Sequence, residues 1–182
     1  LLRPWGVRLG ALAAALLPAG TVSTEAISSG VRAIYGTAWA KQPTWICALC
    51  LDDGRLVPFG RKGSPPAAMA EAVAASCAIP AYFQPVLIGG KRYVDGGSHS
   101  VTNADLLAGA GMDLVIVSCP MGGTRDGFTR GIDLPLRAAI RARLAREVAQ
   151  VRRSGTAVLP FHPTREVRAA VGDTPVDPRR CA

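Results

Sequence analysis

The sequence predicts an α/β fold, and three observations lead to this prediction. The continuous apolar run Trp45–Leu51 is typical of a strand that is buried on both faces of a sheet, and the run Leu114–Ser118 is predicted to be a second buried strand. Segments with helical patterns lie between and after these runs, as in α/β proteins. Asp95 follows the strand-forming pair Tyr93 and Val94 and precedes two glycines, so a carboxylate stands at a strand end. Open α/β sheets place their chemistry at such ends.

The composition is consistent with one domain and an aliphatic core. The chain has 182 residues, of which 49% are hydrophobic and only 5% aromatic, a length that suits a single domain. Its net charge of +8, from 21 basic and 13 acidic residues, favours anionic partners such as a phospholipid surface. No basic run is interleaved with aromatic residues, so we expect no nucleic-acid partner. The oligomeric state stays open.

The cysteines point to neither a disulfide framework nor a metal site. There are five, an odd number without regular spacing. Cys47 and Cys50 have the spacing of half a zinc site, but no second pair or histidine cluster completes it. Both also lie in the predicted strand Trp45–Leu51, where positions three apart face opposite sides. We therefore expect no metal.

The N-terminal segment has two interpretations. Val7–Leu17 is predicted to form a short buried helix that ends at Pro18. Residues 1–26 also resemble a secretory signal peptide, because two arginines precede an apolar run and then small residues. No apolar run reaches the roughly 20 residues of a membrane-spanning helix. A cytoplasmic protein, peripheral to a membrane, is the main expectation, and an exported protein is the alternative.

The first half of the chain is predicted to form two helices and two hairpins. A helix capped by Ser23 or Thr24 is expected to run to Tyr35, with Ile27, Val31 and Ile34 on its apolar face. The remaining elements, in order, are a turn at Asp52-Asp53-Gly54, a returning strand over 55–59, a helix over 67–76 and a hairpin that turns at Gly89-Gly90.

The second half is predicted to contain two helices and two strands. A helix is expected over 103–111, with Asn103 and Asp105 as capping residues. The buried strand Leu114–Ser118 follows, then a loop over 120–129. The clearest helix of the chain is 134–153, whose apolar positions recur at helical spacing: Leu136, Ile140, Leu144, Val148 and Val151. A last strand is expected over 156–160.

Residues 75–97 carry a family resemblance. They read Ala-Ser-Cys-Ala-Ile-Pro-Ala-Tyr-Phe-Gln-Pro-Val, then a glycine-containing hairpin, then Asp-Gly-Gly. This run resembles the second signature block of the patatin-like phospholipases, and Asn103-Ala-Asp105 also fits that family. A weaker likeness extends from Trp45 to about Pro160. The resemblance implies a mostly parallel sheet flanked by helices in a three-layer sandwich. Residues 1–182 would then be an N-terminally incomplete domain, with a loosely held tail over 172–182.

The resemblance also implies an acyl hydrolase with a Ser–Asp dyad. Asp95 would be the catalytic base, on a turn supported by Gly96 and Gly97, and the substrate a lipid or another ester. The family's nucleophile lies in a Gly-x-Ser-x-Gly elbow upstream of this block, and no serine of the 182 residues has glycine on both sides at that spacing. The nucleophile is therefore expected outside this sequence. No cofactor is implied, and the basic helix 134–153 could contact an anionic membrane.

Three alternatives concern the residues after Asp95. Gly96-Gly97-Ser98-His99-Ser100 is a broken elbow between a strand and a helix, so Ser98 is a candidate nucleophile of a small exported esterase. His99 is either a neighbour of the site or a solvated loop residue, and Asn103 is a further candidate neighbour. His162 is interpreted as structural. Without its serine, the segment could instead be a non-catalytic remnant that binds lipid or protein.

Overall fold

The computed structural model describes residues 17–121, 133–164, 166 and 167, and for 133–137 only the backbone. The chain divides into two compact units between His99 and Ser100. Each unit combines helices with a sheet, so the predicted α/β class is confirmed. Residues 7–16 of the predicted N-terminal helix, most of the 120–129 loop and the 172–182 tail lie outside the described residues. Among the described helices, none is both long and apolar enough to cross a membrane.

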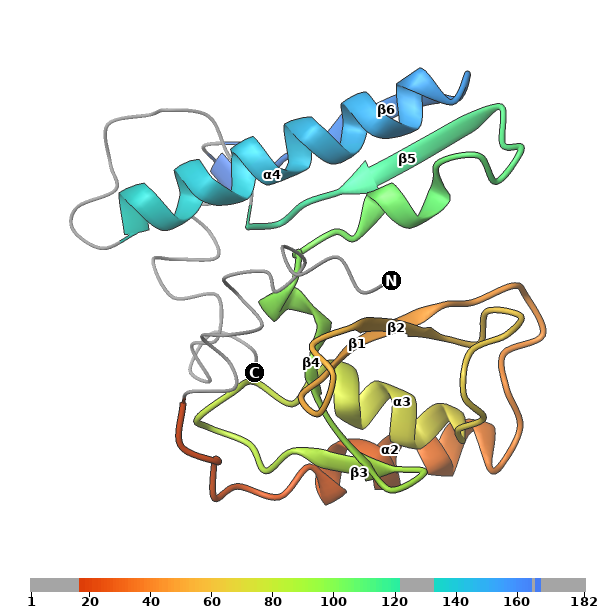
Figure 1. Ribbon diagram of the computed structural model, residues 1–182, viewed down its shortest axis with the longest axis vertical. Coiled ribbons are helices and arrows are strands. Elements are labelled where there is room, and N and C mark those ends of the chain that lie inside the picture. Colours follow the sequence, from red (N-terminus) through yellow and green to blue (C-terminus); the bar gives the residue numbers. More distant parts are fainter. Residues whose placement is uncertain (1–16, 122–132, 165, 168–182) are drawn as a thin grey trace. The chain divides into compact units, whose positions relative to one another are not determined.

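The first unit contains a four-stranded sheet in the order β2-β1-β4-β3 (Figure 1). Its strands are β1 (Ile46–Cys50), β2 (Leu56–Phe59), β3 (Val86–Ile88) and β4 (Lys91–Asp95). Every pairing in this sheet is antiparallel, whereas we expected mostly parallel pairing. For β1 with β2 and for β3 with β4 the reason is local: short turns at 52–54 and at Gly89-Gly90 reverse the chain, and Gly89 and Gly90 have positive φ, 56° and 77°.

Two helices accompany this sheet, α2 (Glu25–Tyr35) and α3 (Met69–Ser76). The small residues Ala72 and Ala75 of α3 are fully buried against the sheet, in a core that includes Phe59 and Tyr93. These two aromatic rings meet edge to face at 5.1 Å. α2 packs against α3. Its predicted apolar face is only partly covered, since Ile34 is 78% exposed.

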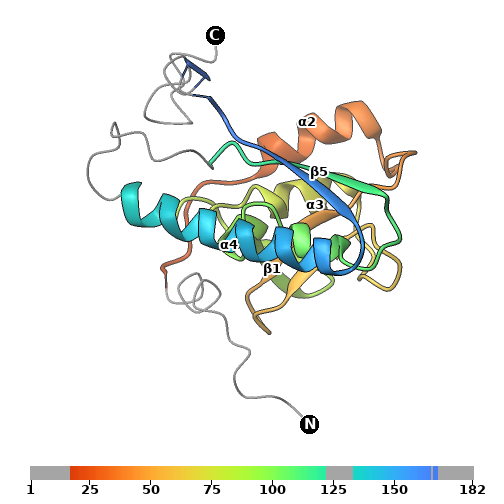
Figure 2. The same cartoon turned by 90° about the horizontal axis from the view of Figure 1, so that it is seen from above.

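The second unit pairs a long helix with two parallel strands (Figure 2). Its elements are the 3₁₀ turn η2 (Ala104–Leu107), β5 (Leu114–Ser118), α4 (Asp133–Arg153) and β6 (Ala157–Phe161). The predicted stripe of α4 is confirmed for its four described side chains. They form the core of the unit with three valines of the strands: Ile140, Leu144, Val148, Val151, Val115, Val117 and Val158.

Two predictions for this unit are wrong. Residues 103–111 form no α-helix but only η2, because Asn103 is left-handed at φ 48° and Gly109 and Gly111 also have positive φ. β5 is not buried on both faces. Its residues alternate between exposed and buried, and Ile116 is 62% exposed, as in a strand that has one face on a core.

Candidate active site

Asp95 lies at the end of β4, as predicted. Its backbone is opposite Ala48 of β1, and its N–H donates to the carbonyl oxygen of Ala78, just beyond α3, at 2.9 Å. The residue is therefore held by a neighbouring strand and by the end of a helix. Such two-sided support fixes the position from which its carboxylate leaves the sheet.

The carboxylate of Asp95 is oriented by the turn that follows it. Its Oδ1 accepts a hydrogen bond from the backbone N–H of Gly97 at 2.7 Å, at the start of the 3₁₀ turn η1 (Gly96–Ser98). Desolvation raises the pKa of Asp95 above its ordinary 3.8, and the Gly97 hydrogen bond only partly offsets this effect. A carboxylate that is oriented and desolvated in this way is a stronger base than one in water.

Gly96 lets the turn approach β1 more closely than any side chain would permit. A Cβ atom on Gly96 would lie 2.4 Å from the carbonyl oxygen of Cys47. At Gly97 the added Cβ would approach Oδ1 of Asp95 to 3.1 Å. The two glycines thus support the predicted turn for different reasons, one by backbone packing and one by room beside the carboxylate.

Cys77 is a neighbour of Asp95 that the sequence analysis did not single out. Desolvation raises the pKa of its thiol, and the negative charge of Asp95 raises it further. A thiol with a raised pKa stays protonated at neutral pH and is a poor nucleophile. Cys77 could have been identified from the sequence, because it lies in the signature block and immediately after α3.

Ser98 and His99 follow Asp95 in sequence and are both half-buried. The backbone N–H of His99 donates to the carbonyl oxygen of Gly96 at 3.0 Å and closes the 3₁₀ turn. Within the described part of the chain, the Ser98 hydroxyl makes no hydrogen bond to a base. This geometry offers no support for an activated serine at position 98.

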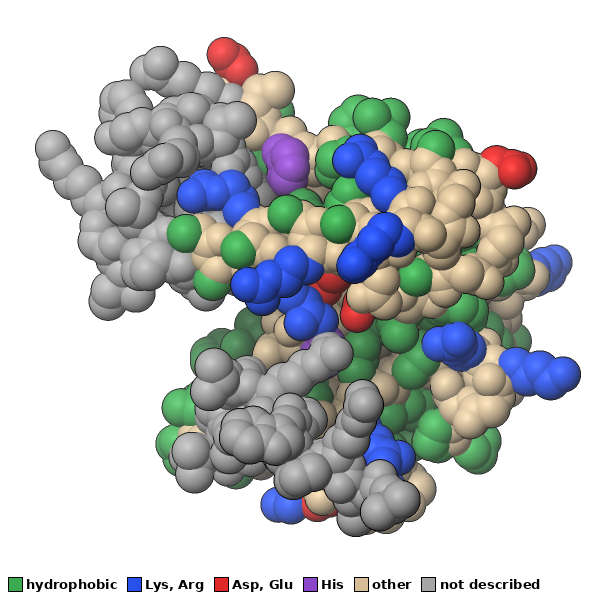
Figure 3. All heavy atoms as spheres, turned by 45° about the horizontal axis from the view of Figure 1, so that its top comes forward, with side chains coloured by type: hydrophobic (Ala, Val, Ile, Leu, Met, Phe, Trp, Pro, Cys, Tyr) green, Lys and Arg blue, Asp and Glu red, His purple; other side chains and the backbone are tan. Residues whose placement is uncertain are grey.

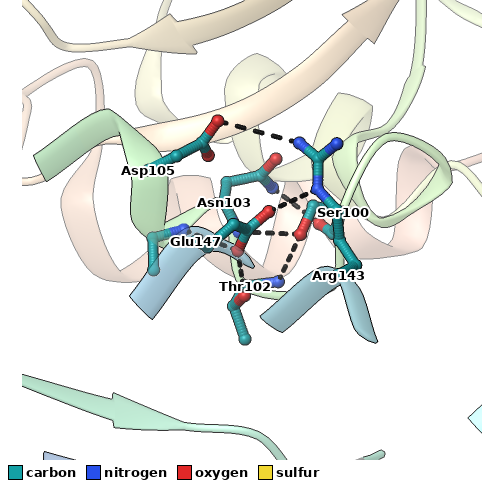
Figure 4. Close-up of polar contacts among 7 residues, drawn as sticks. Ser100, Thr102, Asn103, Asp105, Arg143 and Glu147 are labelled. Atoms are coloured by element: carbon teal, nitrogen blue, oxygen red, sulfur yellow. Dashed lines mark hydrogen bonds and ion pairs between the residues drawn. The ribbon is translucent and has the colours of Figure 1, made fainter. Parts of the chain in front are cut away.

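In the second unit, the carboxylate of Glu147 on α4 forms hydrogen bonds with the loop that begins at Ser100 (Figure 4). Glu147 is only 2% exposed. Its carboxylate accepts from the Thr102 hydroxyl at 2.6 Å, from the N–H of Ala104 at 3.1 Å and from Nε of Arg143 at 2.7 Å. Burial alone would raise the pKa of Glu147, but these donors together with Ser100 lower it. Glu147 therefore stays ionised and anchors this loop.

The predicted capping roles of Asn103 and Asp105 are not seen. Asn103 makes no side-chain cap on η2; its Nδ2 donates instead to the Ser100 carbonyl oxygen at 2.7 Å. The N–H of Ala104 donates instead to the carboxylate of Glu147. Asp105 lies 3.7 Å from the guanidinium of Arg143. Asn103 therefore belongs to the loop that Glu147 anchors.

The described residues offer no obvious metal site. No group of three His, Cys, Asp or Glu side chains is placed to hold an ion in the part of the chain that is described. Cys47 and Cys50 lie on β1, where Cys50 is fully buried.

The segment that contains Asp95 matches a known protein family. Residues 47–108, from β1 to the end of η2, match the family model of the patatin-like phospholipases. This segment is therefore similar to the patatin-like phospholipases. The resemblance predicted from the sequence is thus confirmed, and the matched residues include Asp95, Gly96, Gly97 and Asn103. The patatin-like phospholipases are a family of lipid acyl hydrolases. α4 and β6 lie beyond the match, and no curated protein matches the chain.

Proposed function

We propose that this chain carries the base of a lipid acyl hydrolase, in which Asp95 works with a serine as a catalytic dyad. The observation that carries the proposal is the oriented, desolvated carboxylate of Asp95 inside the patatin-like segment. The substrate is a lipid or another carboxylic ester. Gly96 and Gly97 build the turn that supports the carboxylate.

The proton transfers that we propose use the carboxylate oxygen of Asp95 that Gly97 does not bind. Oδ1 of Asp95 is held by Gly97, so Oδ2 takes the proton of the serine hydroxyl as the serine oxygen bonds to the acyl carbon. The ester C–O bond then breaks, and the departing alkoxide receives that proton. In the second half-reaction a water molecule attacks the acyl carbon and gives a proton to Asp95. The bond from the acyl carbon to the serine oxygen then breaks, the serine oxygen takes that proton back, and the carboxylic acid is released.

The nucleophilic serine of this proposal belongs to a longer polypeptide, upstream of Leu1. The spacing of the serines supports this, because none within the 182 residues lies in a complete Gly-x-Ser-x-Gly elbow. The alternative nucleophile, Ser98, has no base hydrogen-bonded to it among the described residues. By itself the 182-residue chain is then inactive. The exposed arginines Arg146, Arg152 and Arg153 of α4 support a peripheral contact with an anionic lipid surface.

Labelling with a fluorophosphonate, followed by peptide mapping, tests where the nucleophile lies. We expect no labelling of the 182-residue chain and labelling of one upstream serine in the longer polypeptide. Labelling at Ser98 would instead make the chain a self-contained esterase. A longer polypeptide without a reactive serine would favour the remnant that binds lipid or protein without catalysis.

A further inference from the structure

Two loops of the first unit meet at the end of the β1–β2 pair where Ile46 lies opposite Phe59. One loop, over 36–45, joins α2 to β1, and the other, over 60–68, joins β2 to α3. In Figure 1 they are the orange and yellow loops that lead to and from these two strands. Neither loop takes part in the chemistry that we propose for Asp95.

The two loops pack against each other and support each other's shape. The indole N–H of Trp39 donates to the carbonyl oxygen of Thr44 at 3.1 Å, so the first loop closes on itself. Gly60 lies directly against this closure, because a Cβ atom there would be 2.4 Å from both the Thr44 oxygen and a ring carbon of Trp39. In the second loop, the Ser64 hydroxyl donates to the carbonyl oxygen of Pro58 at 2.6 Å. The side chains of both loops therefore share one supported surface.

The surface of these loops is basic. It carries three exposed cationic side chains, Lys41, Arg61 and Lys62, and neither loop contains an Asp or Glu. The acidic residue nearest to them in the sequence is Glu71 of α3, whose carboxylate accepts the N–H of Ala68 at 2.9 Å. Figure 3 shows Lys and Arg side chains that project from the first unit at the lower right. The charge of the two loops is therefore complementary to an anionic partner.

Aromatic and aliphatic side chains accompany the basic ones. The guanidinium of Arg61 lies 4.9 Å from the ring centre of Trp45, which is partly buried. At the end of α2 from which the first loop starts, Ile34 is 78% exposed and Tyr35 is 42% exposed. The N–H of Ala38 donates to the Tyr35 carbonyl oxygen at 3.0 Å, so the chain turns directly from the helix into the loop. Basic groups combined with exposed aliphatic and aromatic groups suit the interface of a lipid bilayer.

We propose that these two loops and the end of α2 form a surface that docks the protein on an anionic lipid bilayer. Lys41, Arg61 and Lys62 bind the lipid phosphates, while Ile34 and Tyr35 enter the headgroup region. The choice of a bilayer over another polyanion rests on the proposed lipid acyl hydrolase function and on the exposed Ile34, which a nucleic acid would leave in water. The surface is built from the first unit alone and involves no residue of α4.

Co-sedimentation of the 182-residue chain with vesicles tests this inference without any turnover. Vesicles in which about one lipid in three is phosphatidylserine should bind the chain at least about tenfold more tightly than vesicles of phosphatidylcholine alone. Lys41→Gln/Lys62→Gln should weaken binding to the anionic vesicles by about 25-fold, since each basic residue near the membrane contributes about fivefold. Ile34→Ala should weaken it by about fivefold, because less apolar surface leaves water.

Matched controls separate local from general effects. Arg55→Gln/Lys91→Gln lowers the net charge by the same amount at the other end of the β1–β2 pair, where Lys91 pairs with Asp53. It should leave binding within about threefold, because salt screens charges that lie far from the membrane. Leu87→Ala, at a position of β3 that is 66% exposed, is the control for Ile34→Ala and should bind like the wild type. Thermal melts of each variant show that the fold is kept.

Several results would overturn the inference: no binding to anionic vesicles, equal binding to phosphatidylcholine vesicles, or equal losses in Lys41→Gln/Lys62→Gln and its control. Wild-type binding by Ile34→Ala would also do so, as would tighter binding of a single-stranded oligonucleotide than of the vesicles at equal phosphate concentration. Hydrolysis of a water-soluble short-chain ester by the longer, serine-containing polypeptide reports on Asp95 instead. Lys41→Gln/Lys62→Gln should leave that hydrolysis unchanged, so failure of the docking surface and failure of the proposed function are distinguishable.

Discussion

The carboxylate oxygen Oδ1 of Asp95 accepts the backbone N–H of Gly97 at 2.7 Å. This bond joins the last residue of β4 to the 3₁₀ turn that follows it and sets the direction of the side chain. It occupies only one of the two carboxylate oxygens. The other is the oxygen that our account assigns to proton transfer, so the bond explains how Asp95 can be both held and reactive.

The pH dependence of activity should report on Asp95. Because desolvation raises its pKa above 3.8, a base that must be ionised should lose activity as the pH falls through that raised value. The acid limb of kcat/KM for the longer, serine-containing polypeptide should therefore have its midpoint above pH 3.8. A midpoint at or below that value would mean that Asp95 is not the titrating base.

Replacement of Gly96 by alanine should disturb the site through the backbone. The new Cβ would meet the Cys47 carbonyl oxygen at 2.4 Å, and neither atom can move without shifting β1 or the turn. We expect a loss of roughly 3 kcal/mol in the free energy of unfolding, the upper range for overpacking. Urea denaturation of the 182-residue chain measures this loss.

Gly30→Ala is the matched control for Gly96→Ala. Gly30 lies within α2, and no atom is within 4 Å of the Cβ that alanine would add. This substitution should stabilise the fold by up to about 1 kcal/mol, because alanine favours a helix over glycine. Equal effects of the two substitutions would contradict the close approach of the turn to β1.

Glu147→Gln should destabilise the second unit. The change removes the charge that pairs with Arg143 at 2.7 Å and that accepts from Thr102 and Ala104. Breaking a buried pair of this kind costs roughly 3 kcal/mol. Glu25→Gln, on a side chain that is 70% exposed, should cost less than about 1 kcal/mol. Comparable losses in the two variants would show that the Glu147 network adds no stability.

A fall in pH should remove the contribution of Glu147 to the free energy of unfolding. Its pKa in the folded chain is lowered from 4.5, so the stability that its ionised form contributes is present above pH 4.5 and is lost as the pH falls through the folded value. The difference in unfolding free energy between the wild type and Glu147→Gln should therefore shrink below pH 4.5. A difference that is independent of pH would show that the charge is not what matters.

Much of the fold could be predicted from the sequence because it depends on local patterns. The apolar spacing of α4 located a helix whose described stripe is buried, and Gly89-Gly90 located a hairpin. A helix was predicted over 103–111 because the composition there suggested a helix start. The prediction was wrong because Asn103 adopts a left-handed conformation, which is held by a hydrogen bond to Ser100. The two predicted hairpins already imply antiparallel pairing of β1 with β2 and of β3 with β4, whereas the pairing of β1 with β4 joins strands that are distant in sequence, which the apolar runs alone do not specify.

The candidate site of the first unit was predictable in part, because Asp95 followed from the strand end and the Asp-Gly-Gly turn. In the second unit, Glu147 was missed. Its partners Thr102 and Ala104 are 45 and 43 residues away in the sequence, so no local pattern could reveal the network. One signal was present: Glu147 lies three residues after Leu144 and four before Val151, as a charged residue on the apolar stripe of α4. A charge at such a position needs partners when it is buried.

Ester hydrolysis by the Asp95→Asn variant of the longer, serine-containing polypeptide tests the central claim most directly. Asparagine keeps an oxygen for the Gly97 N–H, and because the folded-state pKa of Asp95 is raised, loss of its charge should not lower stability at neutral pH. We predict that kcat falls at least about a hundredfold while the unfolding midpoint is unchanged or higher. Asp113→Asn, at an exposed position, should retain full activity. Turnover by Asp95→Asn at the wild-type rate would contradict the assignment of Asp95 as the catalytic base.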